Sequence, residues 1–114
     1  RHGVWKNLEQ KYQPFINYDN HPFHELGGAW MKKDHIFTSP FYYIDYCLAQ
    51  ICALELWEES QTDFKTALIK YNQLCECGGT KTFLEILKGA GLESPFDVDV
   101  IKRLAYRACV FLEL

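Results

Sequence analysis

The chain has 114 residues, of which 48% are hydrophobic and 24% are charged, a composition that suits one domain with a modest core. Aromatic residues make up 16% of the chain, which excludes a disordered or low-complexity protein. Twelve basic residues stand against fifteen acidic ones and leave a formal net charge of −3. That balance carries no electrostatic signature of nucleic-acid binding, so we expect no nucleic-acid partner.

The cysteines and the hydropathy of the chain indicate in which cellular compartment the protein is expected. The five cysteines are an odd number and no secretory signal segment precedes them, which favours free thiols in a reducing cytoplasm. The most apolar run, residues 41–57, contains Asp45, Gln50 and Glu55. Three polar groups in so short a run argue against a membrane helix. We therefore expect a cytoplasmic protein without a membrane segment.

The first third of the chain combines one helical pattern with a long irregular stretch. The spacing of Trp5, Leu8 and Tyr12 predicts a first helix over residues 4–12. Turn-forming residues then break the pattern over residues 14–38. Because aromatic residues are scattered through this stretch, we expect an ordered loop or short helical turns packed on a core.

A central helix is expected to open at Ser39-Pro40, with Ser39 as its N-cap and Pro40 at its first helical position. At 100° per residue its side chains divide into two faces. The apolar face holds Phe41, Ile44, Cys47, Leu48, Ile51, Cys52 and Leu54. The opposite face holds Tyr42, Tyr43, Asp45, Tyr46 and Gln50. This division indicates burial on one side and a lined cavity on the other, with tyrosines in an ordinary helix–helix interface as the alternative.

Three more helices are expected after the central one. The next opens at Thr62-Asp63 and ends at Gly78-Gly79, and a short one covers about residues 81–88. The last follows Ser94-Pro95. The expected apolar stripes are Phe64, Ala67, Leu68, Tyr71 and Cys75 on the first, and Ile101, Leu104, Ala105, Ala108 and Leu112 on the last. The sequence thus predicts an all-α fold of about five helices in a single partial domain over residues 1–114.

The segment His24-Glu25-Leu26-Gly27-Gly28 begins like the zinc-binding motif HExxH. That motif needs a second histidine four residues on, on the same helical face, and Gly28 occupies that position. We therefore predict no metal ligand in this chain. A zinc site gathered across a loop from His21, His24, Glu25 or His35 stays open as an alternative.

Two segments resemble the oligoendopeptidase F family of zinc metallopeptidases, which are related to thimet oligopeptidase. They are residues 27–30, Gly27-Gly28-Ala29-Trp30, and residues 35–50, HIFTSPFYYIDYCLAQ. Shorter matches follow at Tyr71, Cys77-Gly78-Gly79, Phe83-Leu84-Glu85, Ala90-Gly91-Leu92 and Ser94-Pro95-Phe96. The resemblance therefore covers nearly the whole chain.

This resemblance implies a fragment of a larger enzyme. The family's catalytic domain is largely helical, encloses a deep substrate channel and holds zinc through an HExxH motif and a downstream glutamate. Those ligands precede the matched region, so the chain resembles the C-terminal part of the catalytic domain. Zinc is then the cofactor of the parent enzyme, held by the missing HExxH-bearing part, and this chain alone is expected to be inactive.

The resemblance also implies roles for individual residues. His35, Tyr43 and Tyr46 correspond to the groups that hold the scissile carbonyl and stabilise the tetrahedral intermediate. A phenolic donor suits that role, because negative charge builds on the carbonyl oxygen when zinc-activated water attacks it. Gly27-Gly28 resembles the family's glycine loop beside the substrate, where backbone N–H groups approach the peptide closely. Tyr42 lies on the same face and is expected to contribute.

The expected function is therefore part of a zinc endopeptidase that hydrolyses short peptides. The competing hypothesis is a non-catalytic helical module that binds a peptide or protein through the tyrosine-rich face and needs no metal. A fragment that exposes the surface it once packed against a missing half is also expected to self-associate.

Overall fold

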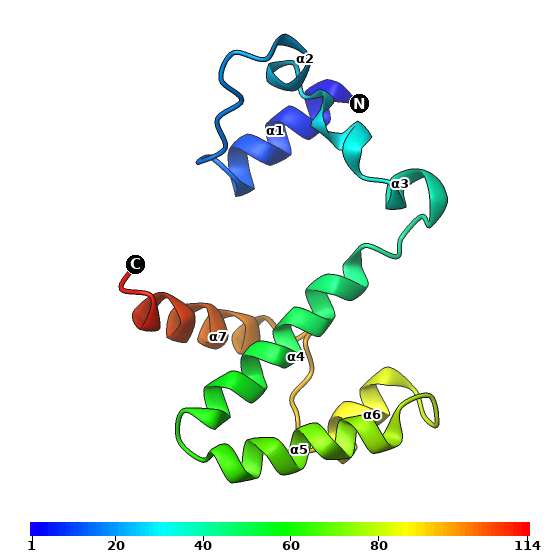
Figure 1. The fold of residues 1–114 in the computed structure, drawn as a ribbon, viewed down its shortest axis with the longest axis vertical. Coiled ribbons are helices and arrows are strands. Elements are labelled where there is room, and N and C mark those ends of the chain that lie inside the picture. Colours follow the sequence, from blue (N-terminus) through cyan, green and yellow to red (C-terminus); the bar gives the residue numbers. More distant parts are fainter. The chain divides into compact units, whose positions relative to one another are not determined.

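Helices make up all the regular structure of residues 1–114 in the computed structural model (Figure 1). The prediction of an all-α fold is confirmed. The structure contains seven α-helices and one 3₁₀ helix rather than about five helices. The chain divides into two units, Arg1–Tyr43 and Ile44–Leu114, and each is described by itself. That the whole chain forms one partial domain stays a prediction.

The first unit contains α1 (His2–Tyr12), α2 (Pro22–Glu25), the 3₁₀ helix η1 (Gly28–Lys32) and α3 (His35–Thr38). The first predicted helix is confirmed, and the irregular stretch after it forms short helical turns. Both α1 and α2 contact η1. Trp30 of η1 is buried, and its indole N–H donates to Nδ1 of His2 at 2.8 Å. This contact ties η1 to the first turn of α1.

Glu9 on α1 holds the following loop in place. One oxygen of Glu9, Oε1, accepts the indole N–H of Trp5 at 2.7 Å and the hydroxyl of Tyr18 at 2.6 Å. The hydrogen bond to Glu9, which stabilises the protonated phenol, raises the pKa of Tyr18 to about 12. Two short hydrogen bonds to one carboxylate therefore fasten the loop around residue 18 to the middle of α1.

The second unit contains α4 (Ile44–Ser60), α5 (Phe64–Cys77), α6 (Phe83–Gly89) and α7 (Val98–Phe111). Helix α4 contacts both α5 and α7, and α6 contacts α5 (Figure 1). A small core is formed by Cys52, Leu87 and Leu92, with Leu56 and Leu74 packed against it. None of the helices reaches the length and hydropathy that crossing a membrane requires.

Capping side chains fix where these helices begin. Asp63 precedes α5 and accepts the backbone N–H of Thr66 at 3.1 Å, as the sequence predicts for an N-cap. Thr82 and Glu85 form a capping box at the start of α6, where Glu85 accepts the backbone N–H of Thr82 at 3.0 Å. Local sequence signals therefore decide these boundaries.

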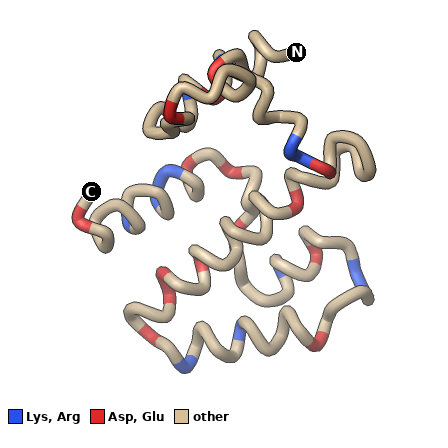
Figure 2. Tube along the Cα trace, turned by 45° about the horizontal axis from the view of Figure 1, so that its top comes forward, with Lys and Arg blue, Asp and Glu red and all other residues tan.

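Polar contacts join two segments to α4: the loop after α6 and helix α7. Glu55 of α4 is buried and accepts the backbone N–H of Glu93 at 2.8 Å, while its burial raises the pKa of its carboxyl. Arg103 of α7 pairs with Glu58 at 3.1 Å and with Glu93 at 2.7 Å. Arg107 pairs with Glu58 at 3.3 Å. Figure 2 shows basic positions, in blue, along the helix that leads to the C-terminus. Because the arginines are partly exposed, these pairs align the helices more than they stabilise them.

The predicted start of the central helix is wrong. Helix α4 begins at Ile44 rather than at Pro40. Phe41 has a φ of +69°, whereas every residue of a right-handed helix needs a negative φ. The backbone N–H of Tyr42 instead donates to the carbonyl of Ser39 at 3.2 Å and closes a turn. Ser39-Pro40 therefore opens a turn. The positive φ of Phe41 in this turn is uncommon for residues other than glycine.

The predicted apolar stripes are only partly buried. On α5, Ala67 is buried, whereas the other four members of its stripe are exposed. On α7, Leu104 is buried and Ala108 half-buried, whereas Ile101, Ala105 and Leu112 are exposed. On α4, Ile44 and Cys47 are exposed while Glu55 is buried. Each helix thus covers a narrow face within its unit and leaves a second apolar face uncovered.

The exposed area of the chain reflects these open faces. Its 13.4 kDa expose 8770 Å², whereas a folded monomer of that mass exposes about 6,500 Å². Two separate globules of the sizes of the two units would expose about 7,800 Å². The exposed area of the chain exceeds both of these values, so the chain buries little surface for its size.

Candidate functional site

The structure brings three of the predicted site residues together. His35 opens α3, Tyr42 closes the turn that begins at Ser39, and Tyr43 comes next. The ring of His35 stacks on that of Tyr42 with centroids 5.7 Å apart, and it meets the ring of Tyr43 edge-on at 5.3 Å. The imidazole is half-buried, whereas about half of each tyrosine side chain is exposed. We call these three residues the histidine–tyrosine cluster.

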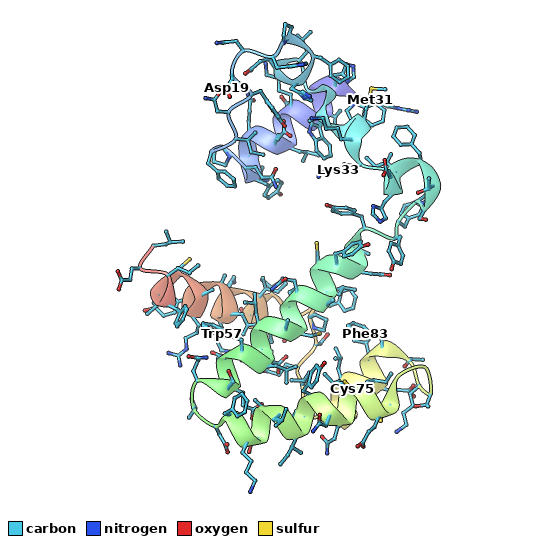
Figure 3. All side chains as sticks on the ribbon, viewed as in Figure 1. Asp19, Met31, Lys33, Trp57, Cys75 and Phe83 are labelled. Atoms are coloured by element: carbon cyan, nitrogen blue, oxygen red, sulfur yellow. The ribbon has the colours of Figure 1, made fainter.

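A cationic side chain adjoins this cluster. The ammonium group of Lys33 lies 5.8 Å from the centroid of the Tyr43 ring (Figure 3 labels Lys33). Attraction between a cation and the face of an aromatic ring favours this placement. The cluster thus combines phenol and imidazole donors with a positive charge, a set suited to an anionic or carbonyl oxygen.

Tyr46 is not part of this cluster. It lies in the first turn of α4, in the second unit. The prediction that Tyr43 and Tyr46 stand on one helix is wrong, because Tyr43 precedes the first residue of α4. The cause is the turn at Phe41, which delays the start of the helix. About half of the Tyr46 side chain is exposed.

The two glycines of the predicted substrate loop are buried against their own unit. Gly27 has a φ of +87°, and a Cβ there would overlap the carbonyl oxygen of His2 and lie 3.0 Å from Cβ of Lys6. A Cβ on Gly28 would overlap the ring of Phe23 and lie 2.6 Å from its carbonyl oxygen. Close packing on α1 and on Phe23 therefore accounts for both glycines. Their contact with a substrate stays a prediction.

His24 is buried among aromatic rings. It stacks on Tyr18 at 5.1 Å and meets His21 edge-on at 4.4 Å. Its Nδ1 has no hydrogen-bond partner. Burial lowers the pKa of His24, and the neighbouring charges of Lys32 and His21 lower it further. Burial and the nearby positive charges thus favour the neutral form of His24.

The residues present do not fit a zinc site. No group of three or more His, Cys, Asp or Glu side chains is placed to hold a metal ion. The Nδ1 of His24 has no hydrogen-bond partner, and the ring packs on those of Tyr18 and Phe23. The alternative of a zinc site gathered from residues 21–35 therefore finds no support in the arrangement of these side chains.

Sequence reasoning missed two residues that shape this unit. Glu9 organises the loop beside α1, and Lys33 adjoins Tyr43. The four-residue spacing of Trp5 and Glu9 could have indicated their contact on one helix face. No local signal could have found the hydrogen bond between Trp30 and His2, which joins residues 28 positions apart.

Comparison with solved structures relates the chain to peptidases. A structure described as oligoendopeptidase F matches it with 40% identity and a TM-score of 0.89. A structure of Pz peptidase A with an inhibitor matches it with 39% identity and a TM-score of 0.90. Each match covers 98% of this chain and 20% of the other.

A third match has the same character. A structure described as oligoendopeptidase F from Bacillus anthracis strain Ames shows 35% identity and a TM-score of 0.63, over 97% of this chain and 20% of its own. No protein-family model and no curated protein sequence matches the chain. The chain thus spans about one fifth of the peptidases it resembles, and the resemblance seen in the sequence is confirmed.

The glycine packing can be tested by substitution. Gly27→Ala should reduce the free energy of unfolding by more than about 1 kcal/mol, because it adds a clash with His2 to the strain of a positive φ. Gly3→Ala is the matched control, since Gly3 lies in α1 with nothing near its missing Cβ, and it should gain up to about 1 kcal/mol. Urea unfolding followed by tryptophan fluorescence measures both. Equal effects of the two substitutions would contradict the packing account.

The burial of His24 predicts a pH dependence. A histidine whose folded-state pKa is lowered favours the neutral form, so its contribution to stability is complete above the unfolded pKa of about 6.5. That contribution should be lost as the pH falls from about 6.5 toward the lower folded pKa. Unfolding measured between about pH 8 and pH 5 should show the loss in the native chain and much less of it in His24→Gln. An unchanged pH profile in the variant would contradict this role.

Proposed function

Because the chain reproduces one fifth of oligoendopeptidase F-type structures at 35–40% identity, we propose that it forms the C-terminal part of the catalytic domain of a cytoplasmic zinc endopeptidase. Its substrates are short peptides. The observation that carries this proposal is the match itself, which extends over 98% of the chain.

In this proposal the chain supplies hydrogen-bond donors and no metal ligand. Its His, Cys, Asp and Glu side chains do not gather into a group that fits a metal. We assign the zinc, its HExxH ligands and the general base to the remaining part of a larger protein. A zinc ion bound there would activate the attacking water and polarise the peptide carbonyl.

The phenols of Tyr46 and Tyr43 donate hydrogen bonds to the carbonyl oxygen of the scissile peptide bond. This oxygen gains negative charge in the tetrahedral intermediate, so a fixed donor stabilises the transition state more than the substrate. The packing of the His35 ring on Tyr42 and Tyr43 supports this role, since ring contacts restrict the side-chain conformations from which a donor acts. Gly27, Gly28 and Tyr42 bind the peptide beside this oxygen.

The exposed apolar faces of α5 and α7 support a partner that covers them. Phe64 on α5 and Phe111 on α7 are each more than 60% exposed. Apolar side chains gathered in this way mark surfaces that pack against other protein. In the proposed enzyme that protein is the missing zinc-bearing part, and in its absence the chain self-associates.

Replacing Tyr46 tests the catalytic role. In a chimera where this chain replaces the matching fifth of an oligoendopeptidase F, Tyr46→Phe should lower kcat for a short fluorogenic peptide about 10²–10³-fold, the usual effect of losing an oxyanion donor. Tyr106→Phe is the matched control, because Tyr106 is an exposed tyrosine of α7, and it should leave kcat unchanged. A loss under about threefold for Tyr46→Phe with the fold intact would contradict the role.

The same chimera tests whether His35 and Tyr43 act in catalysis or only in peptide binding. His35→Ala and Tyr43→Phe should each lower kcat with little change in KM, since their interactions strengthen only as charge develops on the oxygen. A rise in KM with kcat unchanged would assign the substituted residue to substrate binding instead. Circular dichroism of each variant confirms that the helices are retained.

A further inference from the structure

A cavity of about 250 Å³ adjoins the histidine–tyrosine cluster within the first unit. Its walls include Trp5, Glu9, Tyr18, Lys32, Lys33 and Tyr43. Sites for drug-sized ligands enclose about 300–1,000 Å³, so this cavity suits a smaller group such as one residue of a peptide. We call it the lysine cavity.

The charges that line the lysine cavity favour an anion. Neither Lys32 nor Lys33 takes part in any of the chain's ion pairs. The ammonium of Lys33 lies against the ring of Tyr43, a contact that leaves its N–H donors available. An anion that enters the cavity therefore meets two positive charges, neither of which is held in an ion pair.

The one carboxylate in the wall is already engaged. Oxygen Oε1 of Glu9 accepts hydrogen bonds from Trp5 at 2.7 Å and from Tyr18 at 2.6 Å. These bonds spread the negative charge of Glu9 over its two donors and fix the carboxylate against the wall. With two lysines and one glutamate, the lining keeps a net positive charge.

The position of the cavity relates it to the proposed chemistry. Tyr43 lines the cavity and also meets the ring of His35 at 5.3 Å. A peptide whose carbonyl lies at the cluster thus has the cavity close to its neighbouring residue. We propose that the lysine cavity binds a carboxylate of the peptide substrate through Lys32 and Lys33, an inference that rests on the proposed function.

The carboxylate has two sources, the C-terminus of the peptide or an acidic side chain. Three probes separate them: N-acetyl-trialanine as the free acid, the same peptide as its C-terminal amide, and an N-acetyl-Ala-Asp-Ala amide. Each is titrated into the intact chain while ¹H–¹⁵N spectra follow the indole N–H signals of two tryptophans. Trp5 lines the cavity and reports on it, whereas Trp57 lies in the second unit and serves as the internal reference.

We expect a saturable shift of the Trp5 signal with one or both carboxylate probes and none with the trialanine amide. A shift with the free acid alone assigns the C-terminal carboxylate, and one with the aspartate probe alone assigns an acidic side chain. The double variant Lys32→Met, Lys33→Met, which keeps the aliphatic stems, should weaken binding about fivefold or more. Lys65→Met is the matched control on exposed α5 and should not change it.

Three results would overturn the proposal: no saturable shift of Trp5 with any probe, equal shifts with acid and amide, or unchanged affinity in the double variant. Because this experiment measures binding without hydrolysis, its outcome is independent of the kinetics of Tyr46→Phe. A carboxylate site that persists while Tyr46→Phe leaves kcat unchanged would refute the oxyanion role alone. The reverse combination would refute the lysine cavity alone.

Discussion

The uncovered apolar surface is the constraint on which most features of this chain depend. Burial of apolar side chains is the main force that holds helices together, yet Leu104 is the only large side chain that is fully buried. Each helix of the second unit presents apolar residues on two faces and covers one of them. The chain therefore has the hydrophobic content of a core but leaves much of it exposed, and it matches only one fifth of the peptidase structures it resembles.

This constraint also explains which predictions from the sequence succeed. Helix ends with local signals are found correctly, such as the Asp63 cap of α5, because a cap depends only on residues a few positions away. The buried face of a helix depends on what packs against it. The stripe through Phe64 and Leu68 is apolar and regular, but both side chains are exposed, so periodicity alone places it in the core wrongly.

The start of α4 and the packing of Gly27 show a second limit. Ser39-Pro40 carries every local sign of a helix start, but the positive φ of Phe41 turns the chain first. Resemblance to a family predicts Gly27 in a loop beside the substrate, and it does not reveal that Gly27 packs against the carbonyl of His2, 25 positions away in sequence. Contacts between distant residues override local patterns, and a single sequence does not display them. In the candidate site, resemblance to a family and not periodicity picks out His35 and Tyr43. The structure places their rings 5.3 Å apart, and their roles stay predictions.

A division of roles between this chain and a missing zinc-bearing part is the central claim, and zinc content tests it most directly. The chain is purified, dialysed against metal-free buffer and subjected to elemental analysis. The proposed division predicts close to zero tightly bound zinc per chain, because no group of side chains here fits the ion. About one tightly held zinc per chain would contradict it and would show that His24 and its neighbours form a self-contained metal site.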